Sequence, residues 1–476
     1  MRLLSTLAAL LFVVVGLMAC DAVIDDTEDP ISSAGDADLD SPDEVDFLVA
    51  GIIARGNNVQ DNMTIQAGLL SDQILFGGDI GGGATFPTFR DLMRGHPPGT
   101  NPLNNNSVDG TQNHLGQYRF LADNILRRVD RLGADAFEGG ESDPLWEAAQ
   151  FHGNFHGGLA RYYWATYFGE LPRSGGGIIS DLDNPADPER GDFVPSDQMY
   201  QLALDKLDEA LNWADDYETR LINTVKARIY LFQDDVAQAA QYAANGLEPG
   251  DAPFQNEYLD RSGNQQNAWF SGGGPGRTQV VTALRFFYGD DYLAQDLESP
   301  EAARIPVFDS NDTGEVTADG LFNRDATSPI RHDVGLEEGD EPVLYAQGLY
   351  MGRDAPIDFA TWQENHLMLA EAAVRGESGE DALGLINEVR ASHGLDDIEQ
   401  DDFDGNEMNT IYLERDKELF TMGLRLPDQR RATIYGLDAE GLDLDLHGWH
   451  LADNTWWFLP ITLDERLNNP NLPNEI

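Results

Sequence analysis

Basic residues are scarce in this chain of 476 residues. Lys and Arg total 30 against 84 Asp and Glu, which gives a formal net charge of −54 at pH 7. A protein that binds nucleic acid or an anionic membrane surface needs a basic face to pair with phosphates, and no stretch of this sequence supplies one. Both functions are therefore excluded. The apolar content of 41% is still enough for a substantial folded core.

Lysine is nearly absent, since only Lys206, Lys226 and Lys417 occur. The carboxylates are spread along the whole chain rather than gathered in one tail. In dilute buffer such a surface repels itself and destabilises the compact state, whereas about 1 M salt shortens the screening length to roughly 3 Å. The composition predicts a halophilic protein, and the alternative is an ordinary acidic surface protein.

The single cysteine excludes an internal disulfide and argues against a cysteine-based zinc site. It lies at position 20, after Arg2 and an apolar run over residues 3–17. This order is typical of a secretory signal over residues 1–19. The Leu-Met-Ala-Cys ending resembles the bacterial lipobox, which implies that Cys20 becomes the lipidated first residue. The alternative is a plain signal peptide with a chance cysteine.

Long apolar runs are absent after the N-terminus, because no later segment approaches 18 consecutive apolar residues. The mature chain is therefore expected to be anchored to a membrane rather than to span it. Residues 20–46 are rich in carboxylates and poor in large apolar side chains. They cannot bury enough surface to offset backbone ordering, so we predict an acidic, disordered tether. Packed structure is expected from Phe47 onward.

Helical periodicity dominates the folded part, and Gly and Pro mark several helix ends. Two helix–turn–helix units with small residues at their crossings resemble tetratricopeptide repeats. The predicted helices cover residues 113–132, 145–168, 196–217, 219–232, 236–246, 359–375, 381–393 and 409–422. Two long segments, about 77–110 and 251–358, are broken by Gly, Pro, Asn and Asp but carry aromatic residues. We predict that they form a functional, loop-rich cap.

Six segments, in order from about residue 160 to the C-terminus, resemble one known family. They are Phe168–Pro172, Val225–Gly246, Glu364–Ala373, Leu385–Arg390, Glu414–Phe420 with Gly423 and Arg425, and Leu459–Ile461 with Asn469–Leu472. In this order they resemble the SusD/RagB family of outer-membrane nutrient-binding lipoproteins, and the lipobox-like ending agrees. The chain departs from the family pattern at Met422, at Leu426–Asp428 and in its last residues.

The resemblance implies a mostly α fold, with tetratricopeptide-like helix pairs in a SusD-like solenoid under an irregular cap, over residues 47–476. It implies a lipoprotein on the outward face of the outer membrane. It also implies a partner, a SusC-like TonB-dependent barrel, on which the protein sits as a lid and to which it delivers an oligosaccharide or peptide. The alternatives are a secreted glycan-degrading enzyme and a helical-repeat scaffold for protein interactions.

Two candidate metal sites have simpler explanations. His152 and His156 are spaced for zinc, but Gly153 stands where a zincin helix needs Glu. Both histidines share a stripe with apolar residues, so a buried pair is the preferred interpretation. Asp309, Asn311 and Thr313 copy the start of a calcium loop, although the twelfth position is Gly320 instead of Glu. We expect no cofactor apart from this candidate structural calcium, whose alternative is an Asx-rich turn.

No nucleophile elbow, phosphate loop or dinucleotide fingerprint occurs, so we predict a binding protein rather than an enzyme. Flat rings in the cap could stack on the apolar faces of sugars or on peptide side chains. The leading candidate is Trp269, because it lies in a Gly-rich, polar stretch and is expected to face solvent. The full set of predicted ligand contacts is Trp269, Phe270, Tyr288, Tyr292, Phe86 and Phe89.

Overall fold

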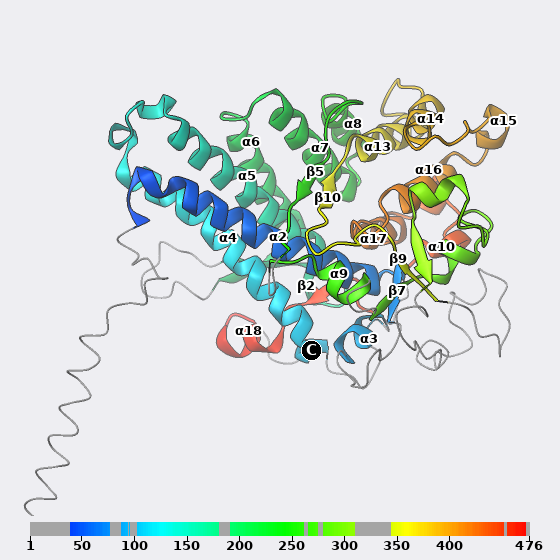
Figure 1. Ribbon diagram of the computed structural model, residues 1–476, viewed down its shortest axis with the longest axis horizontal. Coiled ribbons are helices and arrows are strands. Elements are labelled where there is room, and N and C mark those ends of the chain that lie inside the picture. Colours follow the sequence, from blue (N-terminus) through cyan, green and yellow to red (C-terminus); the bar gives the residue numbers. More distant parts are fainter. Residues whose placement is uncertain are drawn as a thin grey trace, which may run out of the picture.

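The computed structural model describes residues 39–76, 87–93, 95, 102–179, 191–260, 265–274, 279–309, 344–451 and 455–472. Helices make up most of this part (Figure 1). The main helices are α2 (Val45–Leu70), α4 (Asn106–Leu132), α5 (Pro144–Tyr167), α6 (Ser196–Ala210), α7 (Asp216–Phe232), α8 (Val236–Ala243), α13 (Trp362–Val374), α14 (Ala382–Ser392), α16 (Glu407–Glu418) and α17 (Arg425–Tyr435). Among the described residues, none of the helices is both long and apolar enough to cross a bilayer.

The remaining elements are short. The helices are α3 (Pro87–Met93), α9 (Ala268–Gly273), α10 (Leu284–Tyr288), α15 (Gln400–Phe403) and α18 (Leu463–Asn468). The strands are β1 (Ile74–Phe76), β2 (Phe168–Leu171), β3 (Ser174–Ile179), β4 (Asp192–Pro195), β5 (Phe254–Asn256), β7 (Val280–Thr282), β8 (Val307–Asp309), β9 (Tyr345–Gln347), β10 (Ile357–Ala360) and β11 (Leu459–Pro460). They form one four-stranded sheet, β11-β2-β3-β4, and the two-stranded pairs β1-β7, β5-β10 and β8-β9.

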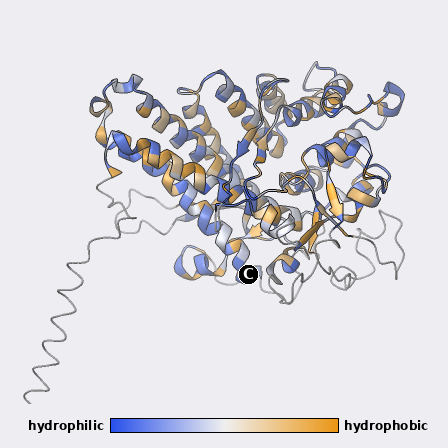
Figure 2. Cartoon of the chain, in the orientation of Figure 1, coloured by the Kyte–Doolittle hydropathy of each residue, from blue (hydrophilic) through white to orange (hydrophobic). Residues whose placement is uncertain are grey.

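The helices pack in series, α2 on α4, α4 on α5, α5 on α6, α7 on α8, α8 on α13 and α13 on α14, and their apolar faces meet (Figure 2). Side-chain caps explain where several begin, including a full capping box in which Asp215 and Glu218 satisfy each other's backbone N–H groups. The predicted solenoid of helix pairs is confirmed. Helices 196–217 and 219–232 divide differently, because the Asp215 cap starts α7 at Asp216.

Two glycines of α5 explain how closely its neighbours approach. A methyl group on Gly153 would lie 2.6 Å from the Leu126 Cγ of α4, and one on Gly158 would lie 2.9 Å from the Leu207 Cγ of α6. Side chains there would push the helices apart. The predicted buried histidine pair lies on the same helix, with His156 6% exposed and its ring stacked on that of His152. The glycine that breaks the zincin pattern is thus a packing residue.

Two of the family-like segments meet although almost 300 residues separate them in sequence. Strand β11, within Leu459–Ile461, pairs in parallel with β2, within Phe168–Pro172. Asn469 reaches the same region and donates from Nδ2 to the carbonyl oxygen of Gly191 at 2.8 Å. These C-terminal elements therefore close the fold on the end of the long aromatic helix α5.

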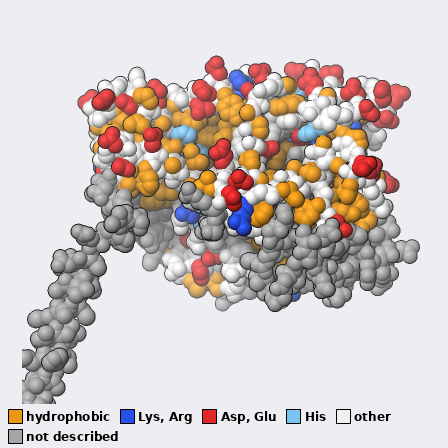
Figure 3. Space-filling model, viewed as in Figure 1, with side chains coloured by type: hydrophobic (Ala, Val, Ile, Leu, Met, Phe, Trp, Pro, Cys, Tyr) orange, Lys and Arg blue, Asp and Glu red, His pale blue; other side chains and the backbone are white. Residues whose placement is uncertain are grey.

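The charged residues of the family-like helices form buried ion pairs. The Arg228 Nε of α7 donates to the Glu364 Oε1 of α13 at 2.6 Å, and both residues are 0% exposed. Other buried pairs join Glu371 to Arg431, Glu414 to Arg304 and Arg390, and Asp428 to Arg415. Much of the scarce positive charge is thus inside the protein, while carboxylates crowd the edges of the face drawn in Figure 3.

Ordered structure begins earlier than the sequence predicts. A 3₁₀ helix spans Pro42–Glu44, and α2 begins at Val45, which is 1% exposed and packs in the main core. Asp40 bonds to Arg128 and Arg131 of α4 at 2.6 Å each. The predicted tether boundary at residue 46 is therefore wrong, and Phe47, taken as the start of packing, is 62% exposed.

Candidate functional site

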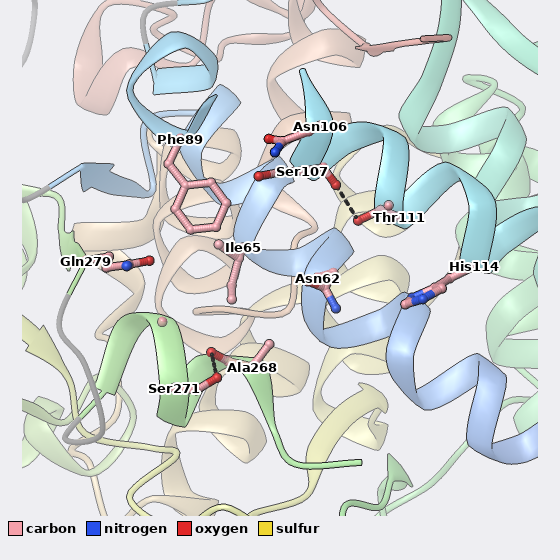
Figure 4. A pocket seen from close by; sticks show the side chains of 12 residues that line it. Asn62, Ile65, Phe89, Asn106, Ser107, Thr111, His114, Ala268, Ser271 and Gln279 are labelled. Atoms are coloured by element: carbon pink, nitrogen blue, oxygen red, sulfur yellow. Dashed lines mark hydrogen bonds between the residues drawn. The ribbon is translucent and has the colours of Figure 1, made fainter. Parts of the chain in front are cut away.

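A cavity of about 360 Å³ lies where α2, α3, α4 and α9 meet. We call it the α2–α4–α9 pocket, and Figure 4 shows side chains converging from these four helices and from Gln279, directly before β7 (Val280–Thr282). Its lining is Asn62, Ile65, Phe89, Asn106, Ser107, Gly110, Thr111, His114, Ala268, Ser271, Gly272 and Gln279. The walls come from distant parts of the sequence, so the pocket exists only in the folded chain.

The wall formed by α2, α3 and α4 is held by hydrogen bonds. Gln66 of α2 donates from Nε2 to the Thr111 Oγ1 at 2.7 Å and to the Ser107 carbonyl oxygen at 3.0 Å. Asn105 caps α4 by accepting from the backbone N–H of Ser107, and its Nδ2 donates to the carbonyl oxygen of Thr88 at 3.1 Å. Helix α3, which carries Phe89, is thus tied to the start of α4.

The opposite wall, α9, is anchored to α2. The buried Asp61 Oδ2 accepts from the backbone N–H of Ala268 at 2.9 Å. Because Asp61 is buried without a cationic partner among the described residues, desolvation raises its pKa to about 7. Asn267 caps α9 by accepting from the backbone N–H of Trp269 at 2.7 Å and donates to the Ala355 carbonyl oxygen. These bonds present Ala268, Ser271 and Gly272 to the pocket.

Trp269 is the central anchor of α9 and is a core residue. Its side chain is 0% exposed, and its indole Nε1 donates to the Thr64 Oγ1 of α2 at 2.8 Å. The ring also lies against Tyr350, with centroids 6.0 Å apart. The prediction that Trp269 faces solvent is therefore wrong, because a helix about 200 residues away in sequence covers the ring.

The pocket lining is polar but carries no carboxylate. Amides and hydroxyls come from Asn62, Ser107, Thr111, Ser271 and Gln279, whereas Ile65, Phe89 and Ala268 supply apolar surface. Partial burial, together with the positive charge of Arg55, lowers the pKa of His114, so its imidazole is neutral at pH 7. Such a lining suits a ligand with many hydroxyl groups and an apolar ring face.

A second cavity, of about 460 Å³, lies between the α7–α8 turn and the C-terminal end of α13. Its lining includes Asp234, Asp235, Glu377 and Glu440, and the one cation, Arg375, bonds to Asp234 at 2.7 Å. This cavity offers no aromatic ring and already pairs its cation. The α2–α4–α9 pocket is the better candidate for a ligand site.

No protein-family model and no curated protein sequence matches this chain. Solved structures do match. A SusD superfamily protein from Bacteroides vulgatus aligns with a TM-score of 0.63 at 14% identity, covering 90% of this chain and 98% of that one. The chain has the SusD fold. The resemblance read from the ordered segments is thus confirmed for the fold.

Two further matches are to proteins whose names state that they bind glycans. A laminarin-binding SusD-like protein aligns with a TM-score of 0.60 at 14% identity, covering 90% of this chain and 97% of that one. Surface glycan-binding protein A from Bacteroides thetaiotaomicron aligns with a TM-score of 0.56 at 14% identity and the same coverages. At these identities the likeness establishes the SusD fold and leaves the ligand to the residues of the site.

The predicted ligand contacts differ in burial and in their distance from the pocket. Phe89 lines the pocket, and Phe270 is partly buried on α9 beneath the guanidinium of Arg353. Tyr292 is buried and donates to the Asp416 Oδ2 at 2.7 Å, so its prediction as a ligand contact is wrong. Tyr288 is partly buried against Phe287.

Several other predictions lie outside the described residues, namely those on Phe86, Cys20, Asn311 and Thr313. Asp309 ends β8. Within the described ranges, no group of three or more His, Cys, Asp or Glu is placed to hold a metal ion, and calcium at residues 309–313 stays a prediction.

Sequence reasoning missed most of the pocket. The sequence predicts a loop over residues 77–110, whereas α3 spans Pro87–Met93 and α4 begins at Asn106 and brings Ser107 to the site. The available signal was Asn105, a typical N-cap residue directly before a helix of mixed polarity. The run of three Asn over residues 104–106 favours a loop instead.

Proposed function

We propose that this protein captures an oligosaccharide in the α2–α4–α9 pocket and releases it chemically unchanged. The Phe89 side chain lines the cavity, and the 9% of its surface that is exposed adds apolar area for a sugar ring. Asn62, Asn106 and Ser271, which line the cavity and are exposed or only partly buried, offer donors and acceptors for hydroxyl groups. The observation that carries the proposal is this neutral, polar lining on a fold shared with a laminarin-binding SusD-like protein.

A pocket-filling variant tests the site. Gly110 lines the pocket, and a Cβ added there meets no atom within 4 Å. The Cβ of Gly110→Leu is therefore unobstructed, and the rest of the side chain should project into the cavity. Gly116→Leu is the matched control, because Gly116 lies on the same helix, also has free space and does not line the pocket. Both changes replace a helical glycine and should stabilise α4 slightly.

The assay is a glycan and peptide array followed by calorimetric titration of each oligomer that binds. We expect an oligosaccharide to bind the wild type and Gly116→Leu with equal affinity and to fail to bind Gly110→Leu. Mass spectrometry of the recovered ligand should show it intact. Equal binding by both variants would move the site elsewhere, a peptide as the only ligand would correct its class, and cleaved glycan would make the protein an enzyme.

We further propose that the protein is a lipoprotein of the outer membrane, facing outward, and serves as a lid on a SusC-like TonB-dependent transporter. The support is the lipobox-like sequence ending at Cys20 and the SusD fold. Cys20→Ala should release the protein from the membrane fraction or leave its signal uncleaved. The wild type should co-purify with a β-barrel transporter. Unchanged fractionation with normal processing would contradict the anchor, and purification without a barrel would contradict the lid.

A further inference from the structure

Arg55 on α2 differs from the other cations of this acidic protein. Many of the arginines that the structure describes are paired inside the fold, as Arg228 is with Glu364 and Arg415 with Asp428. Within the part of the chain that the structure describes, Arg55 forms neither a hydrogen bond nor an ion pair. Partial burial lowers its pKa and no carboxylate offsets the effect, yet an arginine remains charged at neutral pH. No carboxylate of the described residues therefore compensates its charge.

Arg55 lies on the face of α2 that carries the pocket. It precedes Asn62 by seven residues, or two helical turns, so both side chains emerge on the same side of the helix, about 10 Å apart along its axis. Helix α4 runs antiparallel alongside, with Gln66 bonded to Thr111 and Gly56 against Tyr118. The positive charge of Arg55 acts on His114, a lining residue. Arg55 thus flanks the His114 end of the pocket.

The electrostatics around this end favour an anion. A formal charge of −54 repels anionic ligands from the protein in general, but the pocket lining contains no Asp or Glu among the described residues. A guanidinium is weakly hydrated and matches the paired oxygens of carboxylates and sulfates. An oligomer that fills the pocket and continues along α2 and α4 would bring its next substituent to Arg55.

We propose that the preferred ligand is an acidic oligosaccharide, and that Arg55 selects it by pairing with a carboxylate or sulfate group. This inference rests on the proposed glycan-binding function. Uronic acids and sulfate esters offer the same chemistry to the guanidinium, so the two sources are separated by the choice of probes.

The test compares three probes by calorimetry at one salt concentration: an oligogalacturonate, a sulfated galactan oligosaccharide and a neutral laminarin oligomer. Arg55→Gln is measured beside Arg131→Gln. Arg131 is on the same helix pair and is 58% exposed in its side chain, so the control removes an equal charge away from the pocket. Arg55→Gln should weaken binding of one or both anionic probes about tenfold or more, the effect of losing a charged hydrogen bond. Binding of the neutral probe and of all probes to Arg131→Gln should not change.

The outcomes separate the two proposals. If the wild type prefers the neutral oligomer, or if Arg55→Gln and Arg131→Gln behave alike on the anionic probes, the inference about Arg55 is wrong while glycan binding stands. If no glycan binds the wild type, or if Gly110→Leu binds as well as the wild type, the proposed function itself fails at this pocket.

Discussion

Replacement of Trp269 should lower the unfolding free energy of the protein, although the sequence around Trp269 is typical of a flexible loop. The ring is 0% exposed and donates a hydrogen bond to Thr64. Loss of a buried Trp side chain to Ala costs about 3–5 kcal/mol of unfolding free energy through lost burial and the remaining cavity. Thr64 keeps its own bond to the Asp61 carbonyl oxygen, so Trp269→Ala leaves no buried donor unsatisfied. Trp269→Phe, which keeps much of the volume, should cost about 1–2 kcal/mol.

The assay is urea denaturation followed by circular dichroism, with Phe47→Ala as the control. Phe47 is an aromatic residue at the start of α2 with 62% of its surface exposed, so its truncation should change the unfolding free energy by less than about 0.5 kcal/mol. If Trp269→Ala is as stable as Phe47→Ala, α9 does not pack on α2 as described. If Trp269→Ala in addition loses glycan binding at unchanged stability, its ring faces the ligand.

Three further predictions concern charge. Arg228→Met should cost about 3–5 kcal/mol of unfolding free energy, because it leaves Glu364 buried without a partner. In denaturation experiments, the double variant Arg228→Met with Glu364→Leu should recover most of this loss. If Arg228→Met alone is as stable as the wild type, the buried ion pair is contradicted. Burial holds the pKa of His156 well below 6.5, so below about pH 6.5 the unfolded chain binds a proton that the folded chain does not, and stability falls as pH falls. His156→Asn should remove this loss of stability, which amounts to at most about 1.4 kcal/mol per pH unit. The same change at the exposed His450 is the control and should leave the loss in place. If the wild type and His156→Asn show the same pH dependence, His156 is not the group responsible. The melting temperature should rise from about 0.1 M to 2 M sodium chloride, mostly at the lower concentrations where screening changes fastest, and a flat curve would refute the halophilic interpretation.

The helices that the sequence predicts well have local signals. Asp143 before Pro144, Asp235 before Val236 and Asp381 before Ala382 each cap a helix through the side chain, and such pairs can be read without the fold. Helix α2 lacks a clear stripe because it buries polar side chains, among them Gln60, Asp61 and Gln66. Its neighbours satisfy them, and no local pattern shows those neighbours.

The structure of the cap could not be predicted from local sequence patterns either, because it depends on distant partners. Its short strands pair across long sequence distances, β1 with β7 and β5 with β10, and therefore look like loop when each is considered alone. Trp269 looked exposed because glycines and amides surround it in sequence, but its burial is decided by Thr64 on α2. The pocket likewise combines α4 with α9, so its polar lining could not be assembled from composition. The aromatic residues that sequence reasoning favoured mostly support the site or the core.

A crystal structure with a bound oligosaccharide that passes the array and titration tests the central claim most directly. The account predicts sugar density between α2, α4 and α9, with one ring against Phe89 and hydroxyl groups within hydrogen-bonding distance of Asn62, Asn106 or Ser271. For an acidic ligand, an anionic substituent should lie against Arg55. Density at the cavity beside Asp234 and Arg375, or on a surface away from both helices, would contradict the account.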